Sequence, residues 1–544
     1  MRRAGTSETV AQGGAAGTIR FMRWKILLVL GLLPAFGQPY DVLIRGARVV
    51  DGTGAPWFRA DVAIAGERIA AVGRLEGAQA KRVVEARGLV LAPGFIDAHS
   101  HALAGLRRHP DAENLIRQGV TTVFEGQDGS SPLPLRAVLE EMEKLRPAVN
   151  IGFFAGHGSI RRQVMGTEMR VPSAEEMERM KALLREAMRD GAFGISTGLF
   201  YVPGNYARTE EVIELARVAA EMGGIHISHM RDEAAEVMAS VAETIRIGEE
   251  GGLPTQVTHH KIIGKANWGK SRETLKLIEE ARARGVDATL DAYPYTASST
   301  GTAALFPQWA LSGGAKALEE RLQAPESRAK IRAEIARRIL EDRGGGDPAN
   351  VVLASCGFDP GLAGKSLADL ARARGLAPTA EDAADIAIEL QRKGGCSAVY
   401  HAISEEDVER VLAYRWTMAA SDGGVVAPGE GAPHPRNYGT FARVLGRYVR
   451  ERGLLCLEEA VWKMTGLPAQ RMGLWQRGLI RPGMQADLVL LDEGKVRDRA
   501  SFDNPHQYAE GVEAVWVNGV ETLQGGRMTG QRGGRALRSA AAGR

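Results

Sequence analysis

The stretch "PGFIDAHSHA" (residues 93–102) ends an apolar run with two histidines that stand two residues apart. Leu89–Ile96 is typical of a short buried strand, and residues i and i+2 of an extended chain point to the same side. The side chains of His99 and His101 are therefore expected to emerge together at the end of this strand. Two neutral imidazoles at one point form half of a site for a divalent transition metal. A pair of surface or hydrogen-bonded histidines would show the same pattern, so other parts of the chain must decide.

Strand-like and helical segments alternate through the middle of the chain. Helical patterns follow short apolar runs at 173–190, 209–222, 232–250 and 271–285. Repeated units of this kind predict an α/β fold with a (β/α)8, TIM-type barrel, in which the strands end at one mouth. Polar residues end several of the strand-like runs, namely His157, His229, His259 and Asp422. A barrel would bring them together with the first histidine pair.

The two ends of the chain have a different character. Residues 38–95 and 475–528 alternate apolar and polar residues between glycine-rich turns, which is typical of hairpins. Neither end has enough strands to be stable alone, so we predict that both build one small β-sandwich. The barrel then covers 96–474, with an insertion or lid at about 300–400 that is rich in charged helix formers. Residues 529–544 are expected to form a disordered tail.

Charge and cysteine content narrow the class of protein. The 69 Lys and Arg residues nearly balance the 66 Asp and Glu residues, and a net charge of +3 is too small to indicate nucleic-acid binding. The three cysteines are Cys356, Cys396 and Cys456. They lie far apart in sequence and outside any CxxC motif, so we predict buried apolar residues with no disulfide or zinc finger.

The N-terminal segment from Met22 reads "MRWKILLVLGLLPAFGQ". A basic start, the apolar run Ile26–Leu33 and small residues up to Gly37 are typical of a secretory signal peptide that is cut after Gly37. The run is too short to span a bilayer as a mature helix, and a disordered tail with an uncleaved anchor is the alternative. We expect residues 1–37 to be an N-terminal extension with a signal peptide, and the mature protein to be periplasmic or secreted.

With these residues assembled, the chain resembles the amidohydrolase superfamily and, within it, the N-acyl-D-amino-acid deacylases (D-aminoacylases). The resemblance runs from about Tyr40 to about Met528. The superfamily signature is "GFIDAHSH", followed by histidines at two later strand ends and a final aspartate. The narrower resemblance rests on "GHGSIR", "SHMRDE", "THHKIIGKANWGKS", "DAYPYTA", "SDGG" and "HPRNYGTFARVLGRYVRE".

The resemblance implies roles for individual residues. His99 and His101 match the histidine pair of the first strand, and His229 and His259 match two histidines that hold the more tightly bound zinc. Asp422 matches the carboxylate that acts as acid and base. Positions that grip the substrate carboxylate in the family correspond to Lys261, Tyr293 and Arg436.

One position departs from the family pattern. The deacylases carry a cysteine ligand in a "GNCG" turn after the second strand, and "VFEGQDGSS" has none. Asp128 stands at the cysteine's position and Glu125 lies nearby, so we expect Asp128 to be the ligand and keep Glu125 as the alternative. A carboxylate suits zinc, manganese or cobalt, and the number of metal ions, one or two, stays open.

These residues predict a zinc-dependent hydrolysis of the amide bond in N-acyl-D-amino acids, or in related peptides with D residues. Asp422 would move the proton between water and the leaving nitrogen. Cyclic-amide hydrolysis, base deamination and a dipeptidase activity are alternatives on the same barrel, and a metal-free scaffold is the alternative outside enzymes. The expected partner is a small substrate, and an oligomer is compatible with the sequence.

Overall fold

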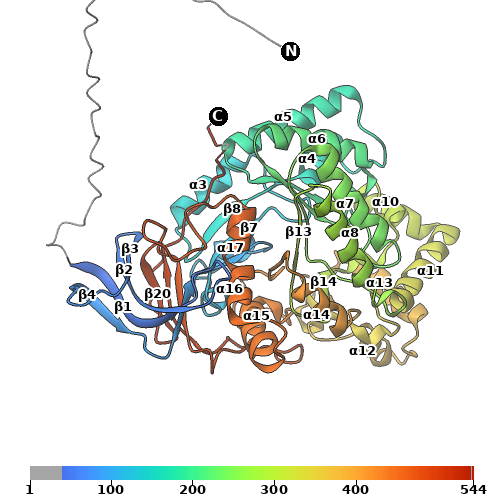
Figure 1. The fold of residues 1–544 in the computed structure, drawn as a ribbon. Helices are drawn as coiled ribbons and strands as arrows, with labels where there is room; N and C mark the ends of the chain where they lie inside the picture. The colour runs from blue at the N-terminus through green and yellow to red at the C-terminus, as the bar shows by residue number, and fades with distance from the viewer. Residues whose placement is uncertain (1–38, 541, 544) are drawn as a thin grey trace, which may run out of the picture. The chain divides into compact units, whose positions relative to one another are not determined.

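The computed structural model describes residues 39–540 and 542–543 (Figure 1). The predicted signal peptide, from Met22 to Gly37, lies outside the described residues. Within the described part of the chain, no helix has the length and apolar character needed to cross a membrane.

The two ends of the chain build one nine-stranded sheet, as predicted. Strand β5 near the N-terminus pairs with β18 near the C-terminus, with Leu91 opposite Leu490. Figure 1 shows the blue and red strands of this sheet side by side. Its apolar face buries residues from both ends, among them Ile44 and Trp516. The strands are β1 (Tyr40–Val49), β2 (Phe58–Ala65), β3 (Arg68–Gly73), β4 (Ala80–Glu85), β5 (Val90–Pro93), β18 (Leu488–Leu491), β19 (Val512–Val517), β20 (Val520–Gln524) and β21 (Arg527–Met528).

The central strands form the predicted parallel barrel. Strands β6, β7 and β8 pair in one sheet, and β9 to β13 with β17 pair in another. Only Phe154 separates β8 from β9, and a bridge between Ser100 and Gly423 joins the first strand to the last. The strands are β6 (Phe95–Asp97), β7 (Val120–Glu125), β8 (Asn150–Phe153), β9 (Ala155–Gly156), β10 (Gly194–Gly198), β11 (Ile225–His229), β12 (Thr255–Val257), β13 (Ala288–Ala292) and β17 (Thr417–Ala419).

Helices follow the barrel strands and bury their apolar faces against them. Helix α5 illustrates how the sequence starts a helix, because the Ser173 hydroxyl accepts from the Glu176 amide and the Glu176 carboxylate accepts from the Ser173 amide. The helices are α1 (Leu103–Arg108), α2 (Glu113–Ile116), α3 (Leu135–Leu145), α4 (His157–Met165), α5 (Ala174–Asp190), α6 (Thr209–Glu221), α7 (Val237–Gly251), α8 (Ser271–Ala283), α14 (Glu405–Ala413), α15 (Arg436–Arg443), the π-helix η6 (Val444–Glu451), α16 (Leu457–Met464) and α17 (Gly466–Arg471). Short 3-10 turns are η1 (Gly204–Tyr206), η2 (Lys265–Asn267), η3 (Thr302–Leu305), η4 (Pro348–Asn350) and η5 (Pro360–Leu362).

The insertion between β13 and β17 has a hydrophobic core of its own. It contains a three-stranded antiparallel sheet in the order β14-β16-β15, with helices packed on one face. Figure 1 shows these helices in yellow, away from the chain-end sheet. The elements are β14 (Ser298–Gly301), α9 (Gln308–Leu311), α10 (Gly314–Gln323), α11 (Pro325–Glu341), β15 (Val351–Cys356), α12 (Leu367–Ala373), α13 (Ala380–Arg392) and β16 (Cys396–Tyr400).

The prediction for the cysteines was wrong in two respects. Cys356 and Cys396 form a disulfide, and Cys456 is exposed rather than buried. The two bonded cysteines are 40 residues apart, but they lie opposite each other in the antiparallel pairing of β15 with β16. Because that pairing is a tertiary contact, sequence spacing alone did not reveal it.

The C-terminal segment also differs from the prediction of a disordered tail. Over 529–540 the chain lies against the barrel, where Ile151 of β8 donates to the Arg535 carbonyl and accepts from the Leu537 amide. Strand β8 pairs with β7 on one side only, so the segment satisfies backbone groups on its other edge. Leu537 packs in a core cluster with Phe124 and Phe154.

Candidate functional site

A cavity of about 810 Å³ opens at the carboxyl ends of the barrel strands. Its walls include strand-end residues of the barrel, the three strands of the insertion sheet and the loop that follows β17. Ligands of TIM-type barrels bind at this end, because loops from separate strands converge there. The cavity is therefore where the predicted site residues are expected to meet.

The structure brings six predicted residues together at the cavity, and we call them the six-residue cluster: His99, His101, Asp128, His229, His259 and Asp422. The first two histidines follow β6. Nε2 of His101 lies 3.2 Å from Asp422 Oδ1 and 3.4 Å from Asp128 Oδ2, and Nε2 of His99 lies 3.6 Å and 3.5 Å from the two carboxylates. This half of the cluster can offer two imidazoles and two carboxylates to one cation.

The other half of the cluster shares Asp128. Its Oδ1 atom lies 3.3 Å from Nε2 of His259 and 3.6 Å from Nδ1 of His229. Asp128 thus stands between the two histidine pairs, with its oxygens facing both. One carboxylate in this position can ligate an ion in either half, or bridge two ions.

The backbone of the cluster is strained. Asp128, His259 and Asp422 have positive φ angles of 54°, 34° and 49°, in the left-handed region that side chains other than glycine seldom adopt. Such conformations cost of order 1–3 kcal/mol each, and they gather at functional sites because the surrounding fold holds them. In these backbone conformations, the three side chains line the cavity.

The donor atoms of the cluster indicate that it can bind a metal ion. Among the described residues, both ring nitrogens of His99 and of His229 are buried without a hydrogen-bond partner. Unpaired buried nitrogens are costly unless something binds them. Imidazole nitrogen and carboxylate oxygen are the donors that zinc takes in proteins. The residues present therefore fit a zinc-type ion.

Glu125, the alternative ligand, is not part of the cluster. Its Oε1 atom accepts from the Leu103 amide at 2.5 Å, and its Oε2 atom accepts from the Gly126 amide at 3.2 Å. Both carboxylate oxygens thus accept from backbone amides, one at the start of α1 and one just after β7. Of the two acidic residues in "VFEGQDGSS", the structure places only Asp128 in the cluster.

Lys261 lies in the cavity wall, but its charge is already paired. Its Nζ atom donates to Glu233 Oε1 at 2.5 Å and lies 2.7 Å from His259 Nδ1. Glu233 Oε1 is also 3.2 Å from that ring nitrogen. Burial opposes ionisation of Glu233, but Lys261, His229 and His259 together outweigh it and lower the pKa of Glu233 well below its usual value. Glu233 ends the motif "SHMRDE", four residues after His229, but it was not predicted from the sequence.

Arg436 and Tyr293 also line the cavity. One Arg436 nitrogen donates to Asp422 Oδ2 at 2.8 Å and another to the Ser299 carbonyl at 3.3 Å. Burial raises the pKa of Asp422, but the Arg436 charge and the nearby histidines lower it far more, so Asp422 is ionised. The Tyr293 hydroxyl is buried without a partner among the described residues, and burial raises its pKa, so it stays protonated and can donate.

A second guanidinium in the wall was not predicted. Arg343 belongs to the insertion and is 5 % exposed. The nearest carboxylate oxygen is Glu233 Oε2 at 3.7 Å, and the guanidinium lies 4.4 Å from the ring centre of Phe200. Across the described residues its side chain has no hydrogen bond. The glycine-rich surroundings of Arg343 carried no signal that could have identified it from sequence.

Three further histidines are structural. His157 was predicted to meet the other strand-end residues, but it lies outside the cluster, and its ring lies 2.9 Å from Glu211 instead. His226 lies between the hydroxyls of Thr197 and Thr255. Burial lowers the pKa of His226 to about 3 and that of His260 to about 4, so both are neutral. The ring of His260 lies 2.8 Å from the Thr274 hydroxyl.

Comparison with known proteins identifies relatives along nearly the whole chain. The model of the amidohydrolase family matches residues 82–522. The chain is 40% identical over 528 residues to a D-aminoacylase of Alcaligenes xylosoxydans xylosoxydans, covering 93% of this chain and 99% of that protein. It is 38% identical over 504 residues to an N-acyl-D-glutamate deacylase of the same organism, covering 89% and 93%.

Solved structures give the same result. A D-aminoacylase crystal structure superposes with a TM-score of 0.79 at 38% identity, covering 92% of this chain and all of that one. An N-acyl-D-glutamate deacylase from Bordetella bronchiseptica, complexed with zinc and a phosphonate mimic of the tetrahedral intermediate, also has a TM-score of 0.79, at 36% identity and with the same coverage. The chain therefore belongs to the amidohydrolase family.

Proposed function

We propose that this protein hydrolyses the amide bond of N-acyl-D-amino acids and releases a carboxylic acid and a free amino acid. The six-residue cluster carries the proposal, because it combines a metal site with an ionised carboxylate in a chain 40% identical to a D-aminoacylase. A metal-free scaffold would have no need of four histidines and two aspartates that converge on one cavity. The deacylases among the relatives act on acyclic substrates that carry a free carboxylate, as their names state.

Zinc is the proposed cofactor. A related deacylase binds zinc, and the metal centre of a related D-aminoacylase is described as binuclear. Here His229, His259 and Asp128 would hold one ion, and His99 and His101 would hold a second with Asp128 and Asp422. When bound, zinc polarises the substrate carbonyl and makes water more acidic. Manganese or cobalt would suit the same donors.

Asp422 is the proposed acid and base. Its carboxylate is ionised and lies at the edge of the cavity, so it can take a proton from the attacking water. It can then pass that proton to the nitrogen of the breaking amide bond. One carboxylate serves both steps because the proton that it accepts is the proton that it later donates. Arg436 holds the carboxylate in place through Oδ2 and leaves Oδ1 facing the histidines.

In this proposal, Lys261 and Glu233 orient the metal ligand His259. When His259 Nε2 faces the metal, Nδ1 on the other side of the ring lies 2.7 Å from Lys261 Nζ and 3.2 Å from Glu233 Oε1, and these contacts fix the ring's orientation. Lys261 neutralises the buried Glu233 and so stabilises this arrangement. Lys261 thus acts mainly through His259, whereas the family resemblance implied a grip on the substrate.

The substrate carboxylate is proposed to bind between Arg436, Tyr293 and Arg343. The first retains donors beyond its bond to Asp422, and the Tyr293 hydroxyl has no partner of its own among the described residues. Arg343 brings a desolvated guanidinium with unused donors to the same wall. Planar guanidinium groups bind carboxylates through two parallel hydrogen bonds, which favours this residue type at an anion subsite.

We also propose that the protein is exported. The Cys356–Cys396 disulfide supports export, because disulfides persist in oxidising compartments and are rare in the cytosol. In a bacterial host, the full chain should reach the periplasmic fraction or the medium with its N-terminus at about Gln38. A form that lacks residues 22–37 should stay in the cytoplasm, and equal distribution of the two forms would contradict export.

Replacing the proposed acid–base residue should separate chemistry from metal binding. Asp422→Asn keeps the size of the side chain but removes the basic oxygen, so kcat should fall by about 10²–10⁴-fold. Metal analysis should still find about one zinc per chain, held by His229, His259 and Asp128. The exposed Asp503→Asn is the matched control and should keep full activity. Near-normal kcat in Asp422→Asn would refute the proposed mechanism.

The ligand assignment at the second strand is tested by metal content. Asp128→Asn removes the carboxylate shared by both histidine pairs, so zinc per chain after dialysis should fall by more than half. Glu125→Gln is the matched control, because its amide oxygen can still accept from the Leu103 amide. Its zinc content should equal that of the unmodified protein. The opposite pattern would make Glu125 the ligand.

Arg343→Met tests the second guanidinium. We expect KM to rise at least about 10-fold for N-acetyl-D-amino acids while kcat changes less, since a charged hydrogen-bonded contact contributes about 1.5–3 kcal/mol. If KM rises only for N-acetyl-D-glutamate and N-acetyl-D-aspartate, Arg343 binds the acidic side chain of the substrate. An equal loss for N-acetyl-D-leucine would place the α-carboxylate there. For analogues in which the substrate carboxylate is replaced by a carboxamide, Arg343→Met should leave KM unchanged. An equal rise in KM with these analogues would show that Arg343 has a purely structural role.

A further inference from the structure

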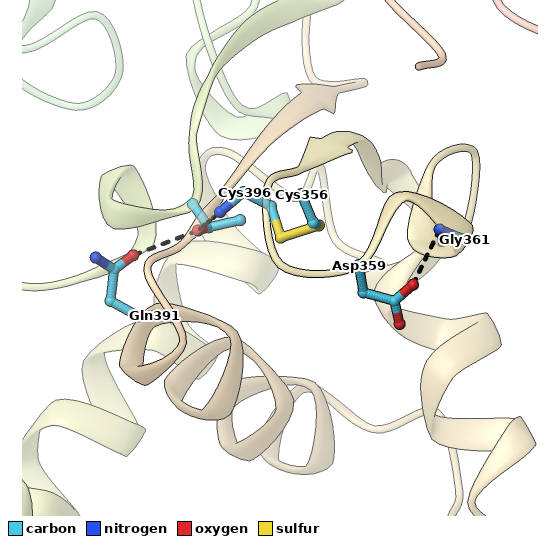
Figure 2. The surroundings of a disulfide bond; sticks show 6 residues. Cys356, Asp359, Gly361, Gln391 and Cys396 are labelled. Atoms are coloured by element: carbon cyan, nitrogen blue, oxygen red, sulfur yellow. Dashed lines mark hydrogen bonds between the residues drawn. A yellow bond between two sulfur atoms is a disulfide. The ribbon is translucent and has the colours of Figure 1, made fainter. Parts of the chain in front are cut away.

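The Cys356–Cys396 disulfide lies in the sheet that forms one wall of the cavity (Figure 2). Cys356 ends β15 and Cys396 begins β16, directly opposite it in the antiparallel register. Contacts on both sides support the bond. The Cys396 amide donates to Thr302 Oγ1 at 3.1 Å, Thr302 donates on to Gln391, and Asp359 caps the turn after β15 through the Gly361 amide.

The residues next to the two cysteines face the cavity. Side chains alternate between the faces of a strand, and here both cysteines point into the insertion's core. Their neighbours Ser355 and Ser397, which are also paired across the strands, line the cavity. The disulfide therefore joins two strands on the core side of a wall whose other side faces the substrate.

A bulge connects this wall to the loop that follows the acid–base residue. The register of β15 shifts between Leu353 and Ser355, and the Ala354 carbonyl accepts from the Ala432 amide at 2.8 Å. Gly431 lies so close that a Cβ atom there would stand 2.6 Å from the Ala354 oxygen. Bulges re-aim backbone groups in this way. The loop 423–434 lines the cavity between Asp422 and Arg436 with Gly423, Gly424, Val426, Glu430, Gly431, Pro433 and His434.

We propose that the Cys356–Cys396 disulfide determines substrate specificity by fixing β15 and, through Ala354, the loop 423–434 against the cavity. The proposal rests on the proposed deacylase function. With the disulfide closed, the serine-lined wall limits the size of the substrate group that lies against it. With the disulfide open, β15 loses its covalent link to β16, and the wall and loop can yield to larger groups. The histidines of the six-residue cluster lie at the ends of barrel strands, outside the insertion, and should be unaffected.

The main test uses the zinc-loaded protein with Cys356→Ser and Cys396→Ser together. For N-acyl-D-amino acids with short and with bulky acyl groups and side chains, we expect the ratio of kcat/KM between the preferred and the disfavoured substrates to fall at least about 10-fold. Zinc per chain should be unchanged. The matched control is Cys456→Ser, which removes the exposed free thiol and should leave the ratio as it is. A ratio within twofold of the original would overturn the proposal.

A second experiment tests the proposal without the double cysteine variant, in case that variant does not fold. The unmodified zinc-loaded protein is reduced with a phosphine, which does not chelate zinc as a dithiol would, and then reoxidised. The substrate ratio should fall on reduction and return on reoxidation, and an unchanged ratio would count against the proposal.

Amide hydrogen exchange separates this proposal from the proposed function. Reduction should speed exchange at Ala432 at least about 10-fold and leave β11 and β12 unchanged, whatever the substrate is. If the protein cleaves no N-acyl-D-amino acid yet Ala432 responds, the function fails and the role of the disulfide in the wall stands. If Ala432 does not respond, the coupling of the disulfide to the loop is wrong.

Discussion

The closure of the barrel between its first and last strands is the contact on which the site depends. The Asp422 amide donates to the His99 carbonyl at 2.9 Å, and the His101 amide donates to the Gly423 carbonyl at 2.6 Å. Asp97 reinforces the contact by accepting from both the amide and the hydroxyl of Ser421. These bonds bring residues more than 300 positions apart within reach of one ion, because parallel strands end at the same mouth of a barrel.

The turn after β7 shows how backbone conformation selects a ligand. Asp128 is flanked by Gly126 and Gly129, which both have positive φ angles and lie too close to neighbouring backbone to carry a side chain. The turn therefore holds Asp128 in the left-handed region with its carboxylate between the two histidine pairs. Glu125 is only three residues away, but it belongs to the strand and its oxygens are used by backbone amides.

The insertion contributes side chains to the cavity that the barrel itself does not carry. It adds Arg343 and the serine-lined wall to the cavity, and its own core and disulfide hold these groups in place. The barrel mouth positions the six-residue cluster, whereas much of the cavity wall comes from this added subdomain and from the loop after Asp422.

Sequence by itself determined the barrel, the joining of the chain ends and the convergence of His99, His101, His229, His259 and Asp422, because strand periodicity and strand-end polarity are local patterns. The tertiary structure alone decided between Asp128 and Glu125, paired Lys261 with Glu233, and brought Arg343 into the cavity. It also formed the disulfide and ordered residues 529–540, both against the predictions from sequence. These features depend on contacts between segments far apart in the chain, which local patterns do not encode.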